Sequence, residues 1–346
     1  MCSSDLGDFV ADQAPDGMIS RTMAVGGSAL HWGGVCNRFS EEDLRLKSMY
    51  GLAVDWPIDW ATLERFYCEA ERRIGVSGEP SPLPEDKRSE PYPMPPMTPS
   101  FNLKQLKAWA EKSGLPFWTT PQAKNTKDGY NGRNACQRCN TCEICPTGAR
   151  YSPDWTFKQL LADKKRHVQL HSRTLVRKLV MDDATSKIVA AEAVSEAGDG
   201  QVTEYRAKTF VIASGYVWSA HLLLLSANAK FPNGLANRTD QVGRYINGHL
   251  AWQAQVDLDL KIYPGMNEQH SLITRKFFRC APTVPYVRHD LRIWESASGR
   301  EPRLRDAAGK LLLGDELLKD WRTRTTRGSA RVRGYYTVRS EEHTSE

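Results

Sequence analysis

The feature that most restricts the fold of this chain is the run Val25-Gly26-Gly27-Ser28-Ala29-Leu30-His31-Trp32-Gly33-Gly34. Four glycines and a serine around a His-Trp pair are not typical of a core helix or of a plain strand. Because glycine has no Cβ, such a run lets the backbone approach a ligand closely and leaves N–H groups free to point at it. A large planar cofactor with a pyrophosphate needs this kind of surface, although a tight turn with Trp32 in the core also fits the run alone.

Length and composition are those of a globular protein with room for two domains. The chain has 346 residues, of which 40% are hydrophobic and 25% charged. Its formal net charge of +6 is spread along the chain, without the dense basic and aromatic face of a nucleic-acid binder. No apolar run approaches the roughly 18 residues of a membrane span. We therefore expect no nucleic-acid partner and no membrane span in this sequence.

The two ends of the sequence differ from the rest. Residues 1–6 and 339–346 resemble translated sequencing-adapter sequence, and neither continues the local pattern. We therefore predict that both segments are artefacts and that the chain is an internal piece of a longer protein. An ordinary polar tail at each end is the alternative. On the first interpretation, the absence of a signal peptide or of a catalytic residue from this sequence says nothing about the longer protein.

In the first half of the chain, two helices are predicted, over residues 59–76 and 101–112. In the first helix the apolar residues Leu63, Phe66, Ile74 and Val76 occur among many charges, and Gly75 and Gly78 mark its end. The segment between them, residues 79–100, contains eight prolines. Because proline interrupts helices and sheets, we expect a long loop there.

The second half alternates between strand and helix patterns. The strands predicted are 168–171, 175–181, 188–194, 209–214 and 251–260, and the helices are 154–164, with Asp154 as N-cap, and 217–227. Residues 205–208 are expected to bring the chain back to the strand at 209–214. That strand, a turn at Gly215 and the next helix form an arrangement that faces a dinucleotide in α/β folds. No G-x-G-x-x-G fingerprint occurs in the sequence.

Half of the eight cysteines lie within ten residues. Cys136, Cys139, Cys142 and Cys145 form C-x2-C-x2-C-x2-C, followed by Pro146. Soft thiolates at this spacing suit an iron–sulfur cluster or zinc, whereas disulfides between such close neighbours are strained. We rank the cluster first, zinc second and disulfides third. The other four, Cys2, Cys36, Cys68 and Cys280, are scattered and are expected to be buried or free.

Taken in order, several blocks resemble the glucose–methanol–choline (GMC) flavoprotein oxidoreductases. They are VGGSALHWGG, Asp55-Trp56-Pro57-Ile58 with its helix, Cys145-Pro146-Thr147-Gly148-Ala149, the strand pair around Val176, residues 211–226, and 241–244 with His249. The bacterial sugar and gluconate dehydrogenase branch is the most similar, because a Trp-bearing glycine loop and a cysteine-rich stretch occur together there.

The resemblance implies a mixed α/β (α+β) fold with two domains. An incomplete FAD-binding, Rossmann-like domain would cover residues 7–250, without its first βαβ unit and with a cysteine-cluster insertion near 134–150. Residues 251–338 would form part of a substrate domain built on an antiparallel sheet.

The resemblance also implies where FAD is bound. The residues implied are Gly26, Gly27, Ser28, His31, Trp32, Gly33, Val176, Ala213, Ser214 and Gly215. In this assignment the glycine loop lies against the cofactor, with His31 and Trp32 near the flavin ring. Val176 contacts the adenine through its backbone, and the last three residues form the second strand-to-helix turn. His31 stands where some relatives attach the flavin covalently, but we favour a histidine that only hydrogen-bonds near the ring.

Two parts of the family pattern are missing from the sequence. The G-x-G-x-x-G unit would precede residue 1, and the catalytic His with its His or Asn partner would follow a segment like the one that ends at Tyr335-Tyr336. Neither His31 nor His249 matches the catalytic position. We therefore expect no catalytic residue in this chain and no activity of the chain by itself.

The family implies an FAD-dependent dehydrogenase that oxidises an alcohol group of a sugar, polyol or aldonate by hydride transfer to flavin. In cluster-bearing sugar dehydrogenases of this family, three cysteines of the equivalent stretch bind a three-iron cluster; the spacing here differs, so all four remain candidates. The expected partners are a haem or quinone acceptor and an accessory subunit. The family branch favours a periplasmic location, with the cytoplasm as the alternative. The alternatives are an iron–sulfur electron-transfer module without substrate oxidation and a zinc-bearing binding protein.

Overall fold

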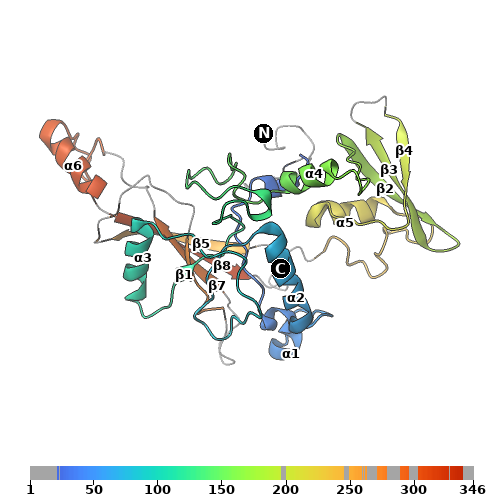
Figure 1. Cartoon of the computed structure of the whole chain (residues 1–346), viewed down its shortest axis with the longest axis horizontal. Coiled ribbons are helices and arrows are strands. Elements are labelled where there is room, and N and C mark those ends of the chain that lie inside the picture. The colour runs from blue at the N-terminus through green and yellow to red at the C-terminus, as the bar shows by residue number, and fades with distance from the viewer. Residues whose placement is uncertain are drawn as a thin grey trace. The chain divides into compact units, whose positions relative to one another are not determined.

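The computed structural model describes residues 22, 24–195, 200–244, 249–258, 260, 262, 271–278, 289–295, 303–326 and 328–337. The predicted artefacts at 1–6 and 339–346, with Cys2 and Cys280, lie outside these residues. The chain divides into two compact units (Figure 1). The first comprises Met1–Gln159 and Gly248–Glu341, and the second comprises Leu160–Asn247 and Glu342–Glu346.

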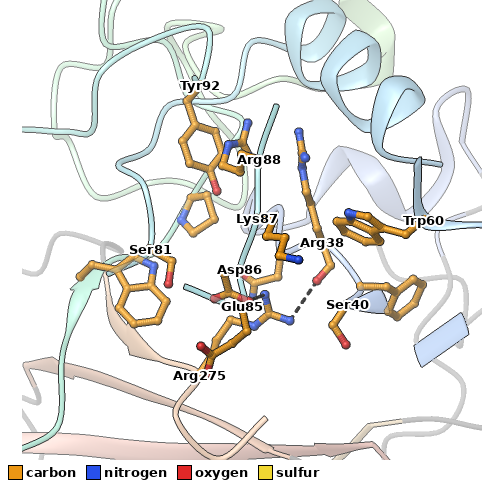
Figure 2. Close-up of a pocket in the computed structure, with 14 residues that line it drawn as sticks. Arg38, Ser40, Trp60, Ser81, Glu85, Asp86, Lys87, Arg88, Tyr92 and Arg275 are labelled. Atoms are coloured by element: carbon orange, nitrogen blue, oxygen red, sulfur yellow. Dashed lines mark hydrogen bonds and ion pairs between the residues drawn. The ribbon is translucent and has the colours of Figure 1, made fainter. Parts of the chain in front are cut away.

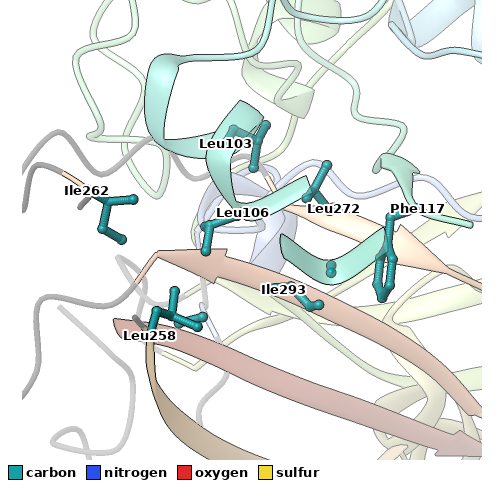
Figure 3. Close-up of a cluster of buried hydrophobic side chains, with 9 residues drawn as sticks. Leu103, Leu106, Phe117, Leu258, Ile262, Leu272 and Ile293 are labelled. Atoms are coloured by element: carbon teal, nitrogen blue, oxygen red, sulfur yellow. The ribbon is translucent and has the colours of Figure 1, made fainter. Parts of the chain in front are cut away.

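The first unit contains a five-stranded antiparallel sheet in the order β1-β6-β7-β8-β5. Its strands are β1 Trp118–Thr119, β5 His249–Leu258, β6 Leu272–Thr274, β7 His289–Glu295 and β8 Gly328–Thr337. Helix α3, Phe101–Glu111, packs on this sheet through Leu103 and Leu106, which contact a buried cluster that includes Leu258, Leu272 and Ile293 (Figure 3). Removing these apolar side chains from water stabilises the contact between helix and sheet.

Among the described residues, three 3-10 helices and three further α-helices also lie entirely in the first unit. They are the 3-10 helices η2 Gly27–Leu30, η3 Glu41–Leu44 and η4 Tyr130–Gly132, with α1 Leu46–Tyr50, α2 Trp60–Ile74 and α6 Gly314–Thr326. Asp59 caps α2 by accepting a hydrogen bond from the Thr62 N–H at 2.8 Å. Gly75 ends α2 in the left-handed conformation that glycine favours. The predicted helices at 59–76 and 101–112 are thus confirmed with slightly shorter bounds.

The predicted helix at 154–164 is α4, Pro153–Ala162. Asp154 lies in its first turn and not at the N-cap, because the helix begins one residue earlier than predicted. In that position its carboxylate still interacts favourably with the helix dipole, and it accepts a hydrogen bond from the Ser152 hydroxyl.

The second unit contains the three-stranded antiparallel sheet β2-β3-β4 and the helix α5, Gly215–Leu225. The strands are β2 Thr174–Asp182, β3 Lys187–Ser195 and β4 Val202–Arg206. Helix and sheet share a core around Leu179, Ala191 and Leu235. Ser226 joins the two directly, because its hydroxyl accepts a hydrogen bond from the Leu179 N–H at 2.8 Å and donates one to the Leu222 carbonyl.

Two predicted strands of this unit are wrong. Residues 168–171 and 209–214 have no strand structure, and Val211 is 84% exposed. An apolar run becomes a strand only when a neighbouring strand pairs with its N–H and C=O groups, and no described strand pairs with either segment.

The fold is a mixed α/β structure with antiparallel sheets, as predicted. The described strands contain no parallel pair of the Rossmann type. The contacts group the chain differently from the predicted domains 7–250 and 251–338, because residues before 159 pack with the sheet that follows 248. The functional division into an FAD-binding and a substrate domain therefore stays a prediction. None of the helices in the described ranges is long and apolar enough to cross a membrane.

Candidate functional site

The glycine loop, residues 24–34, is held in a conformation that requires glycine. Gly26 has φ 109°, and a Cβ there would come within 2.8 Å of Leu30 Cδ2. Glycine is therefore required at this position by the packing within the loop. Gly27 has φ 59°, and a Cβ on Gly27 or on Gly33 would meet nothing within 4 Å. The loop therefore presents backbone with open space above it, which fits the close approach of a cofactor.

The His-Trp pair of this loop is held by backbone hydrogen bonds. Trp32 is half-buried, and its indole N–H donates to the Tyr151 carbonyl at 2.8 Å. The His31 N–H donates to the Ser28 carbonyl at 3.1 Å, whereas the His31 side chain is exposed. Trp32 is thus fixed by the segment that follows the cysteines, and the imidazole of His31 is left accessible.

Arg150 joins the glycine loop to the cysteine loop, residues 136–147. Its guanidinium donates to the carbonyls of Leu30 at 2.7 Å and Ala29 at 3.4 Å, and also to that of Glu143 at 3.3 Å. Its backbone N–H donates to Cys145 Sγ at 3.4 Å. Arg150 is 3% exposed, so both loops are held together by a buried cation.

The four clustered cysteines line one hollow, together with Lys124, Arg138 and Arg150. Cys136, Cys142 and Cys145 are partly buried, whereas Cys139 is exposed. All six described cysteines are free thiols, so the disulfide alternative is not formed. Among the described residues, no group of three or more His, Cys, Asp or Glu side chains is arranged to hold a single metal ion.

The surroundings of the thiols shift their pKa values in different directions. Burial raises the pKa of Cys136, against the opposite effects of a backbone hydrogen bond from Arg138 and of the charge on Lys124. Burial also acts to raise the pKa of Cys145, but hydrogen bonds from the Arg150 N–H and from Thr147 outweigh it and lower the value. The Thr141 hydroxyl lowers the pKa of Cys139. The hollow therefore supplies hydrogen bonds and positive charge that favour thiolates.

Three cations are buried around this loop: Lys124, Arg133 and Arg150 are each between 1% and 3% exposed. Arg133 donates to the carbonyls of Ile74 at 2.6 Å and Ala149 at 3.0 Å. None of the three forms an ion pair with a carboxylate in the described part of the chain. Burying charges without counter-charges is costly, so the site fits an anionic group, as a thiolate-bound metal centre is.

The remaining predicted FAD contacts lie in the second unit. Val176 is on β2, opposite Ala193 and next to a register shift, and is 40% exposed. Ala213, Ser214 and Gly215 precede and begin α5, and all three are exposed. Gly215 has φ 83°, and a Cβ there would meet nothing within 4 Å, so this turn also presents accessible backbone.

A second hollow of the first unit is structural in character (Figure 2). Arg38 donates to Glu64 and Glu71 at 2.8 Å each, and Arg88 donates to Glu71 at 2.5 Å. Arg275 donates to the Arg38 carbonyl at 3.1 Å and to Asp86 at 2.8 Å. These ion pairs connect the chain after the glycine loop to α2, to the proline-rich loop and to the end of β6.

Replacing Glu64 by glutamine is expected to lower the free energy of unfolding at neutral pH by roughly 2–3 kcal/mol. Burial acts to raise the pKa of Glu64, but hydrogen bonds from Ser89 and Arg38 outweigh it and lower the value from 4.5 to about 2. A carboxylate with a depressed native pKa contributes stability above pH 4.5, and this contribution is lost as the pH falls towards 2. Urea unfolding at several pH values should therefore show the two proteins converging in acid.

The exposed pair Arg72–Glu90 gives the matched control. Glu90→Gln is expected to change stability by less than about 1 kcal/mol, because solvent screens an ion pair at the surface. A pH-independent loss in Glu64→Gln would contradict the assigned electrostatic role.

The sequence is similar to known oxidoreductases. Residues 121–251 match the family model of GMC oxidoreductases. The fructose dehydrogenase large subunit of Gluconobacter japonicus is 33% identical over 231 residues, 65% of this chain and 41% of that protein. The 6'''-hydroxyparomomycin C oxidase of Streptomyces lividus is 34% identical over 229 residues, 64% of this chain and 41% of that protein. The chain thus spans about two fifths of the length of these curated relatives.

Among solved structures, an FAD-dependent oxidoreductase from Chaetomium thermophilum has a TM-score of 0.46 at 12% identity, covering 92% of this chain and 61% of that chain. This likeness is too distant to support an argument. The family match and the curated relatives agree with the resemblance found in the sequence: the chain is similar to GMC oxidoreductases, and FAD is the cofactor that this similarity implies.

Sequence reasoning missed the buried cations of this site. Arg150 directly follows the predicted block at 145–149, and Lys124 lies at the start of a polar stretch. The residues that flank Arg150 and Lys124 in the sequence do not show that either cation is buried. Their burial arises from pairing between segments, since an isolated antiparallel bridge joins Lys124 to Arg150.

Proposed function

We propose that the protein is an FAD-dependent dehydrogenase that oxidises an alcohol group of a sugar, polyol or aldonate. We further propose that electrons leave through an iron–sulfur cluster held by Cys136, Cys139, Cys142 and Cys145. The observation that carries this proposal is Arg150, which binds the glycine loop and the cysteine loop to each other within one unit. In a dehydrogenase with an electron relay, the flavin and the cluster must be held at a constant distance and orientation.

The chain's own residues would bind and orient the redox groups. Gly27 and Gly33 would let the cofactor lie against the backbone, and Trp32 would stay oriented through its hydrogen bond to Tyr151. FAD held there would supply the hydride acceptor for oxidation of the alcohol carbon. The four thiols would hold the cluster, which supplies one-electron transfer. The buried cations compensate negative charge at the cysteine loop.

The names of the relatives support a sugar-like substrate. One is named as the large subunit of a fructose dehydrogenase and the other as an oxidase of an aminoglycoside. The cysteine loop favours a dehydrogenase that passes electrons to a haem or quinone acceptor, with an accessory subunit, over direct transfer to oxygen. The periplasm suits such an acceptor chain and remains part of the proposal.

Spectra and metal analysis of the full-length protein test this function. Flavin absorption bands with a broad visible shoulder are expected, together with iron and acid-labile sulfide in stoichiometric amounts. Anaerobic addition of fructose, gluconate or a polyol should bleach the flavin bands. Stoichiometric zinc without sulfide would contradict the relay. A protein with iron and sulfide whose flavin no alcohol reduces would instead be an electron-transfer module.

A further inference from the structure

Lys124 is the one cation among the three around the cysteine loop whose head group has no protein acceptor. The side chain is 1% exposed, and its Nζ makes no hydrogen bond. The guanidinium groups of Arg133 and Arg150, by contrast, donate to backbone carbonyls. An ammonium group has three donors and is strongly hydrated in water, so its burial without any partner is unfavourable.

Backbone hydrogen bonds hold Lys124 between the two loops of the site. On one side the Ala123 N–H donates to the Gly34 carbonyl at 2.7 Å. On the other side the Cys136 N–H donates to the Asn125 carbonyl at 2.9 Å, and the Tyr151 N–H donates to the Ala123 carbonyl at 2.8 Å. The position of the lysine therefore follows from the same pairing that places the cysteines.

The side chain of Lys124 lines the hollow that the four cysteines share. The hollow contains no carboxylate among its lining residues. A negatively charged group bound by the four thiols would supply the acceptor that Lys124 lacks.

We propose that Lys124 is the counter-charge of the metal centre on the cysteine loop and that it raises the reduction potential of that centre. This inference rests on the proposed function, because it requires a redox-active group on the cysteines. A fixed positive charge at low dielectric stabilises the more negative, reduced state over the oxidised state. Lys124 is thus a positioning and tuning residue, since it acts through the group that the thiols bind.

The test is a potentiometric titration of the cluster in the full-length protein, followed by electron paramagnetic resonance. Lys124→Met removes the charge and keeps the length of the side chain, whereas Lys124→Arg keeps the charge. We expect Lys124→Met to lower the midpoint potential by at least 59 mV, the equivalent of a tenfold change for one electron. Lys124→Arg should stay near the wild-type value. Lys127→Met, three residues along in an exposed position, is the matched control and should leave the potential unchanged.

The outcomes separate this inference from the proposed function. Wild-type protein without iron and sulfide would overturn the relay itself. A loaded wild type with equal potentials in Lys124→Met and Lys124→Arg would overturn only the role of Lys124. If Lys124→Met does not fold, the neutral, polar Lys124→Gln replaces it in the comparison. Loss of iron from both neutral variants but not from Lys124→Arg would support the same role, because charge alone distinguishes them.

Discussion

Replacing Gly27 by valine is expected to weaken FAD binding by at least about a hundredfold, or roughly 3 kcal/mol. Gly27 has φ 59° and open space at its Cβ position, so a branched side chain would project where the cofactor approaches the backbone. The measurement is the flavin-to-protein ratio after gel filtration, followed by titration of the apoprotein with FAD. Folding is checked independently by circular dichroism.

Gly114→Val is the matched control for backbone strain. Gly114 also has a positive φ, 76°, with nothing within 4 Å of its Cβ position, but it lies in the exposed turn after α3. Both substitutions therefore impose similar conformational strain, and only the one at Gly27 lies on the glycine loop. A folded Gly27→Val protein with normal FAD content would exclude this loop from the cofactor site.

The elements that could be predicted from the sequence are those whose stability is local. Helix α2 has its own cap at Asp59 and its own left-handed end at Gly75, and both are visible as residue types at the right spacing. The paired strands β2 and β3 follow each other directly and are both rich in apolar and β-branched residues, so each strand and its partner are close in the sequence.

The elements that were predicted wrongly depend on a partner elsewhere in the chain. Residues 209–214 have the apolar composition of a buried strand, but the described strands offer them no neighbour. Composition reports how apolar a segment is, whereas strand formation depends on which segment pairs with it. The predicted strand at 168–171 failed for the same reason.

The candidate site was predictable in its ligands but not in its electrostatics. Glycines and cysteines are unusual enough at this density to be recognised without a structure. Lys124 is one of 47 Lys and Arg residues, and only its pairing with Arg150 shows that it is buried beside the thiols. Burial of a cation is a property of tertiary structure, which periodicity and spacing do not encode for a loop.

Replacing Cys142 by serine is expected to separate the two half-reactions of the enzyme. Cys142 lines the cysteine hollow but is not part of the glycine loop, so reduction of the flavin by substrate should stay within about twofold of wild type. Electron transfer to a haem or quinone acceptor should fall at least about tenfold, because loss of one thiolate shifts the potential of a cluster or removes it. Stopped-flow absorption measures the two steps separately, and iron analysis follows the occupancy of the site.

Cys68→Ser is the control for exchanging a thiol for a hydroxyl. Cys68 is 3% exposed and hydrogen-bonds to Arg38 and Glu64, away from the cysteine hollow, and serine can make the same hydrogen bonds. We expect this variant to keep both half-reactions and its iron. A structural zinc site predicts a different result for Cys142→Ser, in which folding and both half-reactions are lost together, because metal binding there contributes to folding. Unchanged electron transfer in a Cys142→Ser protein that has lost its metal would show that the cysteine loop is not on the path to the acceptor.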